Sequence, residues 1–149
     1  MARGRGIAEP LLVLGADTAC VQHGRLIGTP QSSDEARAML EGFRSASHEV
    51  VTGVALIGQE TGDSGVPKVR SLFASSATVK WGDVSDGEIE KYIESGGWQG
   101  KAGAYNLRER LDAGWPIECE GDPNGVMGLP IAALSRRIQT LIAFEGGVR

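Results

Sequence analysis

The sequence has few aromatic residues, few cysteines and no long hydrophobic run. Phe, Trp and Tyr make up 5% of its 149 residues, so aliphatic side chains and alanine must form most of the core. Its two cysteines, Cys20 and Cys119, provide neither a disulfide framework nor the spacing of a zinc site. No apolar stretch approaches the roughly 20 residues that cross a bilayer, and no signal-peptide pattern begins the chain. We therefore expect a cytoplasmic protein with no membrane partner.

The chain also lacks an excess of positive charge. Fifteen Lys and Arg residues stand against 19 Asp and Glu, which gives a formal net charge of −4, so no nucleic-acid partner is expected. The length suits a single domain, which we place at residues 1–149, with residues 1–10 as a frayed basic end. Glycine alone is in excess, at 22 residues, about twice its usual share of ~7%.

Apolar patterning predicts several strands. The continuous apolar run Leu11–Gly15 suits a short strand that is buried on both faces and ends at Ala16. The two longest β-prone runs, joined by a polar loop over 59–67, are typical of an antiparallel hairpin. The last two predicted strands are short and could pair with each other. The predicted strands cover 11–15, 19–22 and 25–28 around a His23-Gly24 turn, 48–57, 68–81, 101–105 and 115–120.

Three helices are indicated by capping signals and helical spacing. Ser32 with Glu35, and Ser85 with Glu88, have the spacing of capping boxes. Pro130 suits the first turn of the last helix, because no N–H is needed there. Strands interleaved with helices predict an α/β fold with a mixed sheet, in which the long antiparallel hairpin is flanked by helices. The predicted helices run from Ser33 to about Arg44, from Ser85 to Gly96-Gly97, and from Pro130 to Phe144.

Asp17 follows the first predicted strand, where open α/β sheets place ligand-binding groups. Its carboxylate could hold a divalent cation or accept a proton from water. The alternative is a turn residue that caps the end of the strand through its own hydrogen bonds. Position alone leaves both interpretations open.

Other polar residues also allow a functional or a structural interpretation. Lys101 lies in a glycine-rich segment that could approach phosphate, but Ala102 replaces the hydroxyl residue of a P-loop, so a solvated lysine is the alternative. Cys20 and His23 have no acid placed to orient the histidine, which favours a buried cysteine and a turn histidine over a nucleophile and its base. His48 is explained equally well by a structural hydrogen bond. An acidic cluster could bind metal or form a solvated turn; it consists of Glu118, Glu120 and Asp122.

Several segments are informative together and in their order. They span nearly the whole chain from Leu11 onward: Leu-Val-Leu-Gly-Ala-Asp-Thr at 12–18, Gly-Thr-Pro at 28–30, 34–40, 48–56, 85–96, Lys-Ala-Gly-Ala-Tyr at 101–105, 120–122 and 126–130. No single segment is specific, but in combination they resemble the Maf family of nucleoside triphosphate pyrophosphatases.

This resemblance implies hydrolysis of a nucleoside triphosphate between its α- and β-phosphates, releasing a monophosphate and pyrophosphate. It also implies a Maf/inosine-triphosphatase-like fold, Asp17 as proton acceptor and as ligand of a divalent cation (Mg or Mn), and Lys101 as a phosphate contact. The Gly-Ala-Asp-Thr segment, with Thr18 beside the acid, is similar to that of the family branch that prefers dTTP and UTP. A metal-activated water, with basic groups that offset phosphate charge, is chemistry suited to this reaction.

Departures from the family pattern shape further expectations. The family opens with a Ser-x-Ser-Pro-Arg-Arg segment that is not matched here, so we expect an N-terminally shortened fold whose exposed sheet edge or apolar face favours a homo-oligomer. Thr29 stands at a family lysine, and Arg108 at a glutamine associated with base recognition; both are expected at the substrate. The alternative to an enzyme is a catalytically silent nucleotide-binding or regulatory oligomerising protein.

Overall fold

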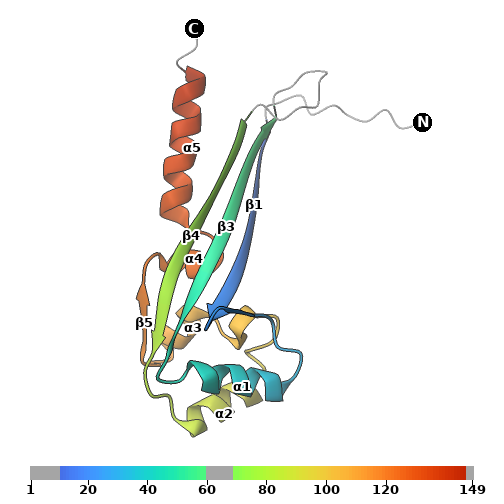
Figure 1. Ribbon diagram of the computed structural model, residues 1–149, viewed down its shortest axis with the longest axis vertical. Coiled ribbons are helices and arrows are strands. Elements are labelled where there is room, and N and C mark those ends of the chain that lie inside the picture. Colours follow the sequence, from blue (N-terminus) through green and yellow to red (C-terminus); the bar gives the residue numbers. More distant parts are fainter. Residues whose placement is uncertain (1–10, 60–68, 147–149) are drawn as a thin grey trace, which may run out of the picture.

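The computed structural model describes residues 11–59 and 69–146 (Figure 1). The end predicted to fray and most of the predicted polar loop lie outside these ranges. The strands are β1 (Leu11–Gln22), β2 (Arg25–Ile27), β3 (Ser47–Gln59), β4 (Val69–Trp81) and β5 (Ile117–Glu120). The helices are α1 (Ser33–Phe43), α2 (Asp86–Glu94), the 3₁₀ helix η1 (Ala102–Ala104), α3 (Leu107–Asp112), α4 (Pro123–Val126) and α5 (Ile131–Gly146).

The five described strands form one sheet in the order β2-β1-β3-β4-β5. The α/β class and the long β3–β4 hairpin are confirmed. The mixed sheet is wrong for the described residues, because every neighbouring pair among these strands is antiparallel. Because β2 and β3 are both antiparallel to β1, they run in the same direction and α1 connects them, but β1 lies between them in the sheet, so they do not pair as parallel neighbours.

Strand β1 is longer and more exposed than its sequence predicts. It continues past Ala16 to Gln22, and its pairing with β3 runs from Leu11↔Gln59 to Val21↔Glu49. Burial on both faces is also wrong, because Leu12, Val13 and Leu14 are 43–49% exposed. One face of the sheet is covered at this end by α5, which lies along β4 rather than β1 (Figure 1).

Local capping signals fix the starts of two helices as expected. Ser32 accepts a hydrogen bond from the Glu35 N–H, although the Glu35 carboxylate accepts from Gln31 N–H instead of closing the box. Ser85 and Glu88 form the complete reciprocal box at α2. The last predicted helix is confirmed as α5. None of the described helices is both long and apolar enough to cross a membrane.

The strand predicted over 101–105 is wrong, because this segment forms η1. Gly103 and Ala104 have φ values of 68° and 67°, and left-handed backbone does not continue a strand. A Cβ at Gly103 would lie 3.4 Å from the Phe43 ring and 3.5 Å from the Cys20 sulfur. The other predicted short strand is confirmed as β5, but it pairs with β4. Helix η1 is thus free to pack against β1 and α1.

An aromatic cluster centred on Phe43 forms the core at the lower end of the sheet. Phe43 is fully buried, and its ring stacks on His48 with centroids 4.0 Å apart. Trp81 and Tyr105 complete the group, with centroids 5.5 and 5.9 Å from that of Phe43. These rings join β3, β4, α1 and the segment after η1, so the core fixes η1 and the start of α3 relative to the sheet.

Candidate functional site

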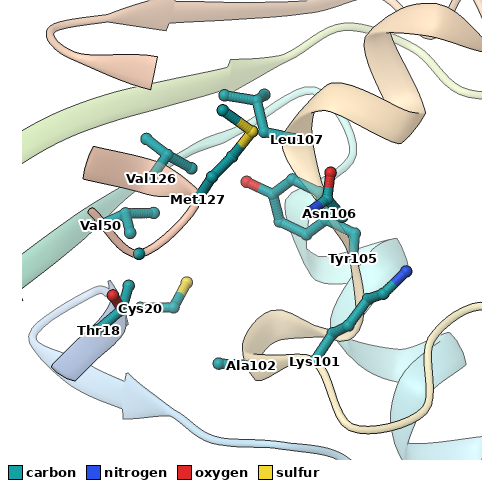
Figure 2. Close-up of a pocket in the computed structure, with 11 residues that line it drawn as sticks. Thr18, Cys20, Val50, Lys101, Ala102, Tyr105, Asn106, Leu107, Val126 and Met127 are labelled. Atoms are coloured by element: carbon teal, nitrogen blue, oxygen red, sulfur yellow. The ribbon is translucent and has the colours of Figure 1, made fainter. Parts of the chain in front are cut away.

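A pocket of about 270 Å³ lies between the sheet, η1 and the segment that follows α4 (Figure 2). Thr18, Cys20 and Val50 line it from β1 and β3. The wall from η1 to α3 contributes Lys101, Ala102, Tyr105, Asn106 and Leu107, and the third wall contributes Val126, Met127 and Gly128. The pocket therefore joins three parts of the chain that are far apart in the sequence.

The Thr18 hydroxyl belongs to a directed chain of hydrogen bonds. Thr52, which is fully buried on β3, donates from its hydroxyl to the Gly125 carbonyl at 2.7 Å. The Thr18 and Thr52 oxygens are also 2.7 Å apart. Because the Thr52 proton is used toward a carbonyl, Thr18 donates to Thr52. The lone pairs of Thr18 are then left for the pocket, which suits a ligand N–H or O–H rather than a phosphate oxygen.

Lys101 is the only charged residue among those that line this pocket, all of which are described. It precedes η1, whose place is fixed by a hydrogen bond from Gly103 N–H to the Gly28 carbonyl at 2.9 Å. The Lys101 ammonium lies 2.6 Å from a carboxylate oxygen of Glu109 on α3. The lysine side chain is 26% exposed, so the ion pair does not cover it completely.

Cys20 in the pocket wall and His48, which lies behind it against Tyr105, stay uncharged at neutral pH. Burial raises the pKa of the Cys20 thiol to about 12, so a thiolate nucleophile is not available. Burial also lowers the pKa of His48 to about 4, and its Nε2 lies 2.8 Å from the Tyr105 hydroxyl. His23 is exposed in the β1–β2 turn. The structural interpretations of Cys20, His23 and His48 are therefore favoured.

Asp17 lies inside β1, so its expected place after a strand is wrong. Side chains alternate along a strand, and Asp17 points to the face of the sheet opposite to Thr18. There it borders an open hollow of about 450 Å³ with Gly15, Gly53 and Leu72. Its carboxylate accepts a hydrogen bond from Thr18 N–H at 2.9 Å and is exposed. The structure brings Thr18 and Lys101 into one pocket but leaves Asp17 outside it.

Thr29 and Arg108 also lie outside the pocket lining. Thr29 is exposed in the loop between β2 and α1, next to the Gly28 carbonyl that holds η1. Arg108 is exposed on α3, and its guanidinium lies 3.2 Å from the Asp112 carboxylate. Neither side chain is placed to touch a ligand in this pocket.

Structural contacts account for two members of the predicted acidic cluster, Glu120 and Asp122. Glu120 pairs with Lys80 across β4 and β5 at 2.5 Å, and Asp122 caps α4 through the Asn124 N–H. Across residues 11–59 and 69–146, no group of three or more His, Cys, Asp or Glu side chains could hold a metal ion. The solvated-turn interpretation is therefore favoured.

Several lining residues were not predicted. Asn106 caps α3 by accepting from Glu109 N–H at 3.1 Å, which leaves its amide NH₂ near the pocket. Capping spacing from Asn106 to Glu109 could have revealed this helix start. Met127 and Gly128 enter the pocket only through tertiary packing, for which the local sequence carries no signal.

Comparison with known proteins bears on this geometry. The family model described as Maf-like protein matches residues 2–141. A dTTP/UTP pyrophosphatase of Halalkalibacterium halodurans is 38% identical over 133 residues, covering 89% of this chain and 64% of the relative. A dTTP/UTP pyrophosphatase of Chromobacterium violaceum is 41% identical over 120 residues, covering 80% of this chain and 56% of the relative. A nucleoside triphosphate pyrophosphatase of Xylella fastidiosa is 37% identical over 145 residues, covering 97% of this chain and 70% of the relative.

The extent of these matches decides the family. Three of the curated relatives, all named dTTP/UTP pyrophosphatase, are longer than this chain, which spans about 62–64% of their length. The family model covers most of the chain, including every segment that lines the pocket. Together with the α/β fold, these matches show that the chain belongs to the Maf-like protein family.

Proposed function

We propose that this chain hydrolyses dTTP- or UTP-type nucleoside triphosphates to a monophosphate and pyrophosphate. The observation that carries the proposal is the single pocket that joins Thr18 with Lys101, in a chain similar to proteins named dTTP/UTP pyrophosphatase. The proposed setting is the cytoplasm, with the nucleotide as partner and with no nucleic-acid or membrane partner.

The polarity of the pocket supports one orientation of a nucleotide. Lone pairs of Thr18 favour a donor group, such as the imide N–H of thymine or uracil or a sugar hydroxyl. The Lys101 ammonium favours phosphate. Apolar surface from Val50, Leu107 and Val126 lies nearby and suits the face of a base.

Asp17 is the proposed proton acceptor. Its carboxylate would take a proton from the water that attacks phosphorus, a P–O bond would form, and the α–β anhydride bond would break to release pyrophosphate. Strand β2 pairs with β1 only over Cys20–Gln22, so the edge of β1 beside Asp17 is not covered by β2. The proposal therefore requires the phosphates to cross this edge from the pocket toward the face that carries Asp17.

The expected divalent metal does not fit a protein ligand set among the described residues. Asp17 is a single carboxylate with Gly15 and Gly53 beside it, and the described part of the chain has no cluster of three or more His, Cys, Asp or Glu side chains suited to a metal ion. Divalent cations usually have several oxygen ligands. The proposed reaction therefore uses no protein-held metal, and the proposed Mg or Mn ion would be bound by the nucleotide's own phosphates.

A silent nucleotide-binding protein is the second candidate, and the placement of Asp17 opposite to the pocket favours it. The test combines two measurements on the purified chain. Pyrophosphate release from dTTP and UTP, with magnesium present, supports the enzyme. Calorimetric binding of a non-hydrolysable dTTP analogue without release supports the silent protein. Absence of both contradicts both functions.

We also propose that the chain forms a homo-oligomer through the uncovered end of its sheet. Val13 and Leu72 are 49% and 58% exposed and lie on the same face as Ala55. Contiguous exposed apolar surface favours an interaction with another molecule. Light scattering at micromolar concentration is expected to show a dimer or larger species, and Leu72→Lys is expected to shift it toward monomer.

Leu26→Lys provides the control for this prediction, because Leu26 is 75% exposed on the short strand β2, away from Val13 and Leu72. A wild-type monomer would contradict the proposal. An equal shift by both variants would contradict the location of the interface.

A further inference from the structure

An ion pair lies at the rim of the pocket. The Lys101 ammonium lies 2.6 Å from Glu109, and Lys101 is the only charged residue among those lining the pocket. A carboxylate therefore already lies where a bound phosphate would meet this lysine. The pair leaves the rim close to neutral in the free protein.

The side chain of Glu109 is not required for the formation of α3. Its backbone N–H completes the Asn106 cap of α3, but any residue supplies that group. Its side chain is 50% exposed, and within the described ranges its carboxylate has hydrogen-bond contact with Lys101 alone. The carboxylate can thus be removed without opening the core.

We propose that Glu109 sets the anion affinity of this pocket by competing with phosphate for Lys101. The inference rests on the proposed function insofar as a phosphate group meets Lys101. A ligand phosphate must share the ammonium and accept a neighbouring carboxylate of like charge, and the repulsion grows with the charge of the ligand. Glu109 is a residue that tunes binding; it does not take part in bond cleavage.

The test measures binding of inorganic pyrophosphate, the product of the proposed reaction, by calorimetric titration at low salt. Glu109→Gln keeps the size of the side chain and removes its charge. Because an exposed ion pair contributes up to about 1 kcal/mol, pyrophosphate is expected to bind about three- to fivefold more tightly to this variant. Orthophosphate should gain less, and added salt should shrink the difference.

Asp112→Asn is the matched control. Asp112 lies on the same helix, is 64% exposed and also loses one negative charge, but its partner is Arg108, outside the pocket. The affinity of the Asp112→Asn protein for pyrophosphate is expected to stay within about 1.5-fold of wild type, because screening weakens distant exposed charges. Equal gains from the two variants would overturn the inference, since they would report net charge alone.

A double-mutant cycle tests whether Glu109 acts through Lys101. In a Lys101→Met background, Glu109→Gln is expected to change pyrophosphate affinity by less than about 1.5-fold. A full gain in that background, or weaker binding in Glu109→Gln alone, would overturn the inference; the latter would mean that Glu109 positions the lysine. Failure of every variant to bind pyrophosphate would overturn it as well.

These outcomes are separate from those of the proposed function. A chain that binds pyrophosphate more tightly after Glu109→Gln but never hydrolyses dTTP supports the inference and contradicts the enzyme. A chain that hydrolyses dTTP with unchanged pyrophosphate affinity in Glu109→Gln supports the enzyme and contradicts the inference.

Discussion

Replacing Asp17 by asparagine is expected to lower the turnover of dTTP by about 100-fold or more. The amide keeps the size of the side chain but cannot accept a proton from water, and loss of a general base has effects of about 10²–10⁴. The remaining oxygen can still accept the hydrogen bond from Thr18 N–H. Because the Asp17 side chain is exposed, the free energy of unfolding of the variant should stay within about 0.5 kcal/mol of wild type. The measurement is the initial rate of pyrophosphate release at saturating dTTP.

Two comparisons make this result specific. Asp34→Asn removes a charge from an exposed carboxylate on α1, where it pairs with Arg37, and should leave turnover unchanged. Denaturant unfolding of each variant separates lost catalysis from lost folding. Wild-type turnover in the Asp17→Asn protein would remove Asp17 from the mechanism, in agreement with its position on the face opposite to the pocket.

The elements that could be predicted from the sequence are those whose causes are local. The Ser85–Glu88 box joins residues three positions apart, so its hydrogen bonds depend on little beyond that segment. The stripe that includes Leu134 and Ile138 likewise defines α5 before any packing is known. The β3–β4 hairpin follows from two long β-prone runs, and among the described residues its register runs from Ser47↔Lys80 to Gly58↔Val69.

The errors arise where tertiary contacts override local preference. Asp17 is a poor strand former, and the apolar run was predicted to end before it, but pairing with Gly53 carries β1 through this position. A longer strand reverses the meaning of Asp17, because alternation then puts it opposite to Thr18. The left-handed Ala104 gave no signal for η1.

The pocket itself could be predicted only in part. Thr18 was identified through a resemblance, and Lys101 through its glycine-rich segment and the same resemblance, but they are 83 positions apart and no periodicity brings them together. The Thr18–Thr52–Gly125 chain depends on three elements meeting in space. The direction of these hydrogen bonds and the Lys101–Glu109 ion pair both result from tertiary packing, so local sequence patterns do not predict them.

The stability of the protein is expected to fall by up to about 3 kcal/mol as the pH drops from 6.5 to 4, because of His48. This imidazole is 3% exposed, and burial lowers its pKa from 6.5 to about 4. Between pH 6.5 and pH 4 the unfolded chain binds a proton at this position that the folded chain does not. The free energy of unfolding therefore keeps this contribution above pH 6.5 and loses it as the pH falls. The shift of about 2.5 units corresponds to about 3 kcal/mol at 1.36 kcal/mol per unit.

The contacts of His48 give no compensation for its positive charge. Phe43 covers one face of the ring and Tyr105 faces Nε2, while Nδ1 has no hydrogen-bond partner among the described residues. The Tyr105 hydroxyl, which contacts Nε2, and the Cys20 thiol of the same core have pKa values that burial raises. Both are neutral over this range, so neither supplies a negative charge to an imidazolium.

Urea unfolding between pH 4.5 and 7.5 measures this dependence, and two variants assign it. His48→Gln lowers stability at every pH but is expected to flatten the curve between 4.5 and 6.5, because glutamine does not titrate. The other histidine is exposed at φ 50°, a conformation that asparagine tolerates, so His23→Asn should keep the wild-type slope. Hydrogen bonds with Ser85 and Arg37 lower the pKa values of Glu88 and Glu90, so the contributions of these two carboxylates to protein stability also decrease in acid. This decrease is expected to be equal in all three proteins. Parallel curves for wild type and His48→Gln would show that His48 is not the source of the pH dependence.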